Sequence, residues 1–326
     1  TNQIPAGSII TVTGLSGSST GTDGSLPVTR NPTGGIPGQG DWNIGGTLKL
    51  TVNGTGLAKS NTYTAAITVT NPTVDQSSPV VGVEVSLQDG SSALGSMAQV
   101  NLTKPDTDLY GVANGRNPLE VLVPAFTVKT IEQSTPFAGA SNGLTVTLTS
   151  NYHLADGSNV TITGLTGSQT PSSSSFSVQS SPSKLGTSGV WNDDGTLILT
   201  ASSGGVTSNT STEVTFTLIN TAGNQNSPSV SVQATIQDGS GTSIGTIAQA
   251  GMELNGAALY EVSDGYKPLQ VVVPVFSVSA VGQSTPVAGE SNVLTVTLEC
   301  STNQIPAGSI ITVTGLSGSS TGTDGS

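Results

Sequence analysis

The feature that most constrains this chain is an internal repeat without a mismatch: residues 302–326 have the sequence of residues 1–25. The two copies are offset by 301 positions (302 − 1). A run of this length does not recur by chance, so we expect the chain to be a section of a longer polymer with a 301-residue period. Such repetition is typical of arrays and scaffolds, and it favours a mechanical role over catalysis.

A second, weaker repeat lies inside this period. Its two halves are offset by about 150 positions, so one period holds two related domains, each of ordinary single-domain size. The matching segments include Gln-Ser-Thr-Pro at 133–136 and 283–286, Leu-Thr-Val-Thr-Leu at 144–148 and 294–298, Trp-Asn at 42–43 and 191–192, and Leu-Tyr at 109–110 and 259–260.

The weaker repeat predicts where the domains divide. Residues 126–275 form a complete domain, and residues 1–125 form a first domain that lacks its opening strands in this section. Residues 276–326 supply the opening strands of the next copy. An alternating strand over Leu119–Val123 closes the first domain. Sheet pairing ends at Pro124, because proline has no N–H to donate to a neighbouring strand. No Gly/Ser linker follows, so we expect a stiff joint and a rod.

Two arrangements would complete the first domain. In a continuous polymer, its opening strands come from the preceding residues of the same chain, and this is the arrangement we prefer. In a strand-donating polymer, residues 276–326 of a neighbouring chain supply them. Residues 302–326 would then compete with residues 1–25 for one place in the sheet.

Apolar residues alternate with polar residues through almost every apolar segment. Leucine and valine alternate with threonine at 144–148, and valine and isoleucine do the same at 160–163. A period of two is typical of strands with one buried face, and β-branched residues favour such strands. The pattern predicts an all-β chain of antiparallel β-sandwich domains with roughly seven to nine strands each. A β-solenoid would need a repeat of about 20–30 residues, and none is present.

Composition limits the expected partners. The net charge is −12, and the 8 Lys and Arg residues do not cluster, so nucleic acid is not expected. No apolar stretch approaches the roughly 20 residues needed to cross a bilayer, so we expect no membrane contact within this section. The expected partners are further copies of the same repeat along a fibre, together with covalent glycans.

The cysteine and the glycosylation motifs bear on location. Cys300 is the only cysteine, which excludes a disulfide within the chain. It is either a small residue at the end of a strand or one half of an inter-chain disulfide. Four Asn-x-Ser/Thr sequons mark Asn53, Asn101, Asn159 and Asn209 as candidate glycosylation sites. The sequons favour an extracellular or cell-surface location.

The sequence offers no constellation of catalytic or ligand-binding residues. His153 is the single histidine, has no partner at the spacing of a metal site or catalytic triad, and is expected in a surface turn. Asp89, Asp193, Asp194 and Asp238 lie in predicted turns, without the dense acidic spacing of a calcium loop. We therefore expect no enzyme activity, no cofactor and no metal site.

The order of these signals resembles the Ig-like repeats of large secreted surface proteins, such as microbial adhesins and microalgal surface proteins. The series runs from Ser-Thr-Pro-x-Ala-Gly through Asn-x-Leu-Thr-Val-Thr-Leu and Thr-Gly-Leu to Trp-Asn and Gly-Thr-Leu, and it covers the whole chain. The resemblance implies tandem Ig-like β-sandwiches in a rod-like array with an extracellular structural role. The chain departs from such repeats by having no disulfide pair and no clear calcium signature.

Two functions are compatible with these features. The first is a structural subunit of an extracellular filament, surface hair or stalk built from 301-residue tandem repeats. The second is an adhesin-type repeat that binds a glycan or a surface directly. The two differ in Trp42 and Trp191, which are core residues under the first function and sugar-stacking platforms under the second.

Overall fold

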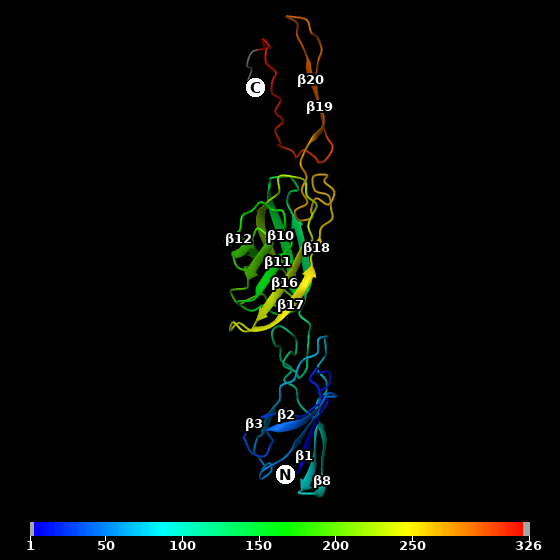
Figure 1. Ribbon diagram of the computed structural model, residues 1–326, viewed down its shortest axis with the longest axis vertical. Helices are drawn as coiled ribbons and strands as arrows, with labels where there is room; N and C mark the ends of the chain where they lie inside the picture. The colour runs from blue at the N-terminus through cyan, green and yellow to red at the C-terminus, as the bar shows by residue number, and fades with distance from the viewer. Residues whose placement is uncertain (1–2, 322–326) are drawn as a thin grey trace.

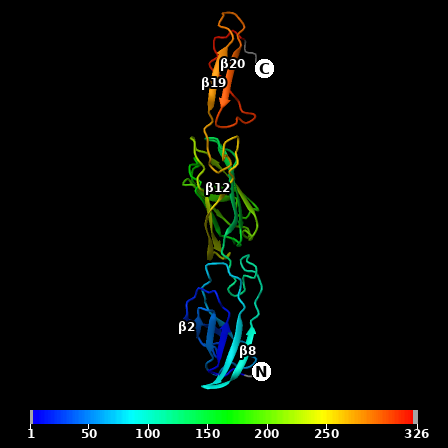
Figure 2. The same ribbon diagram turned by 90° about the vertical axis from the view of Figure 1, so that its right-hand side faces the viewer.

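A computed structural model of the chain describes residues 3–321 and shows an elongated all-β molecule (Figure 1). Three parts follow one another along the long axis in both views (Figures 1 and 2). We call them the first unit (residues 3–125), the second unit (residues 126–275) and the end hairpin (residues 276–300). The all-β prediction is confirmed, and the sheets are almost entirely antiparallel.

The second unit contains one sheet of 10 strands in the order β17-β16-β11-β14-β13-β12-β15-β10-β9-β18. Strand β12 pairs with β13 through Ser173–Ser177 and with β15 through Val178–Ser181, so the sheet folds over along this strand. The strands are β9 (Phe126–Gln133), β10 (Ser141–Ser150), β11 (Asn159–Thr163), β12 (Ser173–Ser181), β13 (Ser188–Asn192), β14 (Thr196–Thr200), β15 (Thr212–Ile219), β16 (Ser231–Gln237), β17 (Ser243–Gly251) and β18 (Glu253–Leu254).

The core of the second unit lies between the two halves of this folded sheet. Leu144 and Val146 of β10 and Val160 and Ile162 of β11 are fully buried in one cluster, as their alternation with polar residues requires. Trp191 lies in the same cluster and is 0% exposed, with its indole N–H donating to the Thr170 carbonyl (3.0 Å). Burial of these side chains is the main source of stability for the unit.

The first unit contains a 6-stranded sheet in the order β2-β4-β5-β1-β7-β8 and a separate pair, β3-β6. Its core is a smaller cluster around Trp42, Leu48 and Leu50, and the Trp42 indole N–H donates to the Thr20 carbonyl (3.1 Å). The strands are β1 (Ile9–Thr13), β2 (Asp23–Pro27), β3 (Thr29–Asn31), β4 (Gln39–Asn43), β5 (Thr47–Thr51), β6 (Thr64–Ala66), β7 (Gly82–Asp89) and β8 (Ser92–Asn101).

Residues 3–125 contain no counterpart of the opening hairpin β9–β10, and the first unit differs from the second at this place. Strand β15 runs over Thr212–Ile219 because β10 pairs with it, whereas the matching strand β6 covers only Thr64–Ala66. On β8, Met97 is 49% exposed, although the matching Ile247 on β17 is 2% exposed. The first unit therefore leaves part of its apolar face open to water.

The end hairpin is formed by β19 (Phe276–Gln283) and β20 (Leu294–Cys300), which pair only with each other. Residues 302–321, predicted as further opening strands, contain no strand. Ile310 in this stretch is 91% exposed, although the identical residue Ile9 lies in β1, between β5 and β7. Without strands on both sides, the same sequence does not form a strand. Residues 1–2 and 322–326 of the repeat lie outside the described residues.

The predicted strand over Leu119–Val123 is wrong except for one bridge, from Val121 to Gln76. Leu119 has a left-handed backbone (φ 55°), which interrupts an extended strand. The segment is fixed by side chains instead: the Glu120 carboxylate accepts from the Ser78 N–H (2.7 Å), and the Asp75 carboxylate accepts from the Val123 N–H (2.6 Å).

We predict that equivalent leucines of the two hairpins differ in their effect on stability. Leu144→Ala removes a fully buried side chain and should lower the free energy of unfolding of the second unit by about 2–5 kcal/mol. Leu294→Ala, at the matching position, changes a residue that is 45% exposed. It should lower the free energy of unfolding of the second unit by less than about 0.5 kcal/mol. Urea unfolding followed by Trp191 fluorescence in a Trp42→Phe background measures both. Equal shifts would contradict this assignment of the core.

Candidate functional site

The joint between the first and second units is the candidate functional site, because the contacts between the two units lie there. Asn151, which follows β10, holds the segment that enters the second unit. Its side-chain amide donates to the Val123 carbonyl (2.9 Å), and its side-chain oxygen accepts from the Ala125 N–H (2.8 Å). Its own N–H donates to the Ala125 carbonyl (3.1 Å). One residue thus ties the connecting segment to the second unit through three hydrogen bonds.

A turn of the first unit reaches across the joint. The His153 N–H donates to the Tyr110 carbonyl (3.0 Å), and the Ser208 hydroxyl donates to the Gly111 carbonyl (2.9 Å). Gly111 has φ 78°, and a Cβ placed there would lie 2.5 Å from the Ser208 hydroxyl oxygen. A side chain at position 111 would therefore have to displace Ser208, and glycine adopts this backbone conformation without strain.

The same backbone contact occurs at the next joint. The Gln304 N–H donates to the Tyr260 carbonyl (2.8 Å), just as His153 N–H donates to Tyr110. Tyr110 and Tyr260 both have a left-handed backbone with φ 52°. One backbone contact, made to a tyrosine with the same backbone conformation, therefore recurs at both places in the chain.

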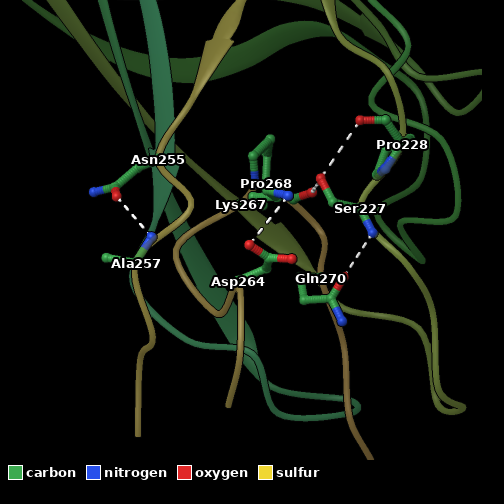
Figure 3. A network of polar contacts seen from close by, with 8 residues as sticks. All are labelled: Ser227, Pro228, Asn255, Ala257, Asp264, Lys267, Pro268 and Gln270. Carbon is green, nitrogen blue, oxygen red and sulfur yellow. Dashed lines mark hydrogen bonds and ion pairs between the residues drawn. The ribbon is translucent and has the colours of Figure 1, made fainter. Parts of the chain in front are cut away.

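Polar side chains hold the last part of the second unit in place (Figure 3). We call residues 264–275 the closing segment. The Gln270 side chain accepts from the Ser227 N–H (2.8 Å), and the Ser227 hydroxyl donates to the Pro268 carbonyl (2.7 Å). Lys267 forms an ion pair with Asp264 (3.1 Å). Ser78 in the first unit makes the same two bonds, to Glu120 and to the Pro118 carbonyl.

A buried polar network connects the opening hairpin to the closing segment. The Gln133 side chain is 3% exposed; it donates to the carbonyls of Gly265 (2.8 Å) and Gln270 (2.9 Å) and accepts from the Leu269 N–H (2.7 Å). The Asn142 side chain donates to Gln133 (2.7 Å) and to Asn220 (2.8 Å). These groups satisfy one another in the core, where an unpaired polar group would cost about 1–3 kcal/mol.

The predicted glycosylation sites lie on both units and are not brought together. Asn53, Asn101 and Asn209 are exposed. Asn159 is half-buried in β11, and its side-chain oxygen accepts from the Thr200 hydroxyl (2.8 Å). Cys300 is a free, half-buried cysteine at the end of β20. Whether any of them is modified stays a prediction.

Other residues singled out in the sequence have structural surroundings. His153 is half-buried at the joint rather than in a free surface turn. The Asp238 carboxylate accepts from the hydroxyl and N–H of Ser240 and from the Thr242 N–H, which lowers its pKa below the usual 3.8. Burial raises the pKa of Tyr152, which packs against the core beside the joint.

Within residues 3–321, no group of three His, Cys, Asp or Glu side chains is placed to hold a metal ion. The described part of the chain likewise contains no helix that could cross a membrane. No protein-family model matches this chain, and no curated protein is significantly similar to it.

The residues that form the joint carry no signal in the sequence. Asn151 and Ser208 bond to backbone carbonyls. Every residue type has such a carbonyl, so the sequence does not reveal which residue accepts the bond. For the buried network a signal was present: Gln133 and Asn142 are polar residues in apolar strands, and both recur at Gln283 and Asn292.

We predict that Asn151→Ala loosens the joint without unfolding either unit. The change removes two side-chain hydrogen bonds, each contributing about 0.5–1.5 kcal/mol. Residual dipolar couplings should then require separate alignment tensors for the two units, where the unchanged chain needs one. Asn61→Ala, at an exposed loop residue of the first unit, is the matched control. A shared tensor in Asn151→Ala would show that this residue does not stiffen the joint.

Proposed function

We propose that this chain is the structural subunit of an extracellular filament, surface hair or stalk built from 301-residue tandem repeats. Each unit is then an Ig-like β-sandwich, and the units form a rod-like array. The proposal rests mainly on the recurring joint, in which Tyr110 and Tyr260 accept the same backbone bond from the following unit (3.0 and 2.8 Å).

The form of the molecule supports this function. The parts lie in line (Figure 1), and the chain passes from Ala125 directly into β9 at Phe126 without a linker. Joints that contain several hydrogen bonds and no flexible segment transmit orientation from one unit to the next. A repeat with such joints gains length with each copy while it keeps its direction, which is what a hair or stalk requires.

The adhesin alternative receives no support from the residues on which it depended. Trp42 and Trp191 are both 0% exposed, and their indole N–H groups are bonded to backbone carbonyls inside their own units. A sugar ring stacks on an aromatic face that is accessible from solvent. Neither indole offers such a face, so direct glycan binding would need a surface that these residues do not form.

Electron microscopy of the native assembly tests the proposal. Antibodies against the second unit should label thin unbranched fibres at a regular spacing of roughly 70–90 Å, the length expected for two sandwiches at about 3.3 Å per strand residue. A preimmune antibody is the control. Labelled particles that are isolated and globular would overturn the filament proposal.

Peptide mass spectrometry tests the proposed extracellular location. Enzymatic removal of N-linked glycans converts a glycosylated Asn to Asp, and we expect this conversion at the exposed Asn53, Asn101 and Asn209. Asn159 should convert least, because its side chain is half-buried and bonded to Thr200. Asn220, which is buried and outside any sequon, is the internal control. Absence of conversion at all four sequons would argue against passage through the secretory pathway.

A further inference from the structure

Two tyrosine carbonyls mark two joints in this chain. At the first joint the Tyr110 carbonyl accepts from the His153 N–H (3.0 Å), and at the second joint the Tyr260 carbonyl accepts from the Gln304 N–H (2.8 Å). Residue 304 repeats residue 3, because the two copies of the repeated segment are offset by 301 positions. In a continuous repeat, the second joint is therefore the place where the second unit meets the next copy of the first unit.

The residue after each tyrosine differs between the two joints. At the first joint it is Gly111, whose carbonyl accepts from the Ser208 hydroxyl (2.9 Å). At the second joint it is Glu261, which is exposed and has φ 62°, a left-handed backbone that glycine adopts with less strain. A side chain that is kept in a strained backbone conformation indicates a use for that side chain.

Ser208 reaches the first joint by a short path through the second unit. His153 is next to Leu154, and Leu154 forms an antiparallel bridge with Val206. Ser208 lies two positions after Val206, just before Asn209, which has a left-handed backbone (φ 57°). This path places Ser208 beside the backbone contact that His153 makes with the tyrosine.

The first unit contains the same path. Ile4 forms an antiparallel bridge with Leu57. Lys59 lies two positions after Leu57, just before Ser60, which also has a left-handed backbone (φ 66°). Lys59 is thus the counterpart of Ser208, and its side chain is exposed. In the next copy of the repeat, this lysine lies beside the second joint.

A side chain at the glycine position leaves no room for the close contact of the first joint. A Cβ added to Gly111 would lie 2.5 Å from the Ser208 hydroxyl oxygen and 2.8 Å from the Ser208 Cβ. The second joint therefore needs a wider gap at this place, which a hydroxyl group does not bridge. Glutamate and lysine side chains are long enough to bridge it, and their opposite charges attract. Within residues 3–321, neither Glu261 nor Lys59 forms an ion pair.

We propose that Glu261 forms an ion pair with Lys59 of the next copy of the repeat, in the place of the hydrogen bond between Ser208 and Gly111. The partner is a second copy of the first unit, because the second joint lies at the end of the second unit that points away from the first unit (Figure 1). The inference rests on the proposed filament and names a contact between its successive repeats.

The filament then contains two kinds of joint in alternation. The joint within each period has a neutral hydrogen bond beside the tyrosine carbonyl, whereas the joint between periods has an ion pair there. Salt screens an exposed ion pair and has little effect on a neutral hydrogen bond. The joints between periods therefore loosen at high salt, and the joints within periods do not.

Carbodiimide cross-linking of the native assembly, followed by peptide mass spectrometry, tests the contact. The reagent joins a carboxylate directly to an amine with loss of water, so it reports groups that touch. We expect a cross-link between Glu261 and Lys59. The ion pair of Lys129 with Glu253 (3.6 Å), which lies within one unit, is the positive control. Glu213, an exposed residue of β15, is the matched control and should not join Lys59.

Hydrogen exchange measures what the ion pair contributes to the second joint. The sample is a chain continued through the first unit of the next copy. Glu261→Gln should speed exchange of the Gln304 N–H by about twofold to fivefold, as expected for an exposed ion pair, and leave the His153 N–H at the first joint unchanged. Salt at about 1 M should do the same. Glu261→Lys should speed exchange further, and Lys59→Glu in the added unit should restore protection.

The outcomes separate this contact from the filament itself. A native assembly that cross-links Lys129 to Glu253 but not Glu261 to Lys59 would overturn the ion pair, and so would Gln304 exchange that Glu261→Gln leaves unchanged. Fibres without the cross-link would reject the ion pair and retain the filament. The cross-link in particles that are isolated and globular would do the reverse.

Discussion

Closure of the second unit by its opening hairpin, β9–β10, is the interaction on which the rest of that unit depends. Strands β9 and β10 bury the inner face of the second unit, and Gln133 and Asn142 bond to its closing segment and to Asn220. Apolar side chains supply the driving force, and the buried amides fix the register, since a shift by one residue would leave them unpaired. The first unit lacks this hairpin and has a smaller core, a shorter β6 and an exposed β8.

The chain contains a direct comparison of one sequence in two surroundings. Residues 9–13 form strand β1 between β5 and β7, whereas the identical residues 310–314 form no strand. Local preference is the same in both places, so neighbouring strands decide the outcome. The end hairpin shows the other limit: β19 and β20 pair with each other, and their turn is held by Asn292, but their apolar face stays exposed.

Much of the fold follows from the sequence because alternation leaves a direct signature. The apolar positions of 144–148 and 160–163 lie in the core, and Trp42 and Trp191 are buried. The predicted strand at 119–123 fails because alternation cannot show that Leu119 takes a left-handed backbone. The joint was beyond prediction for another reason: Asn151, His153 and Ser208 bond to main-chain carbonyls of distant residues, and any residue type provides such a carbonyl.

The contact between Val272 and the connection that joins β9 to β10 has a mechanical consequence. Val272 forms a parallel bridge with Phe137: its N–H donates to the Pro136 carbonyl (2.8 Å), and its carbonyl accepts from the Ala138 N–H (3.0 Å). The chain enters the second unit from the first unit and leaves it at the opposite end, towards β19 (Figure 1). Tension along the molecule would load these bonds in shear, so that they yield together rather than one after another. Resistance of the unit to such tension is therefore set by its unfolding rate rather than by its equilibrium stability.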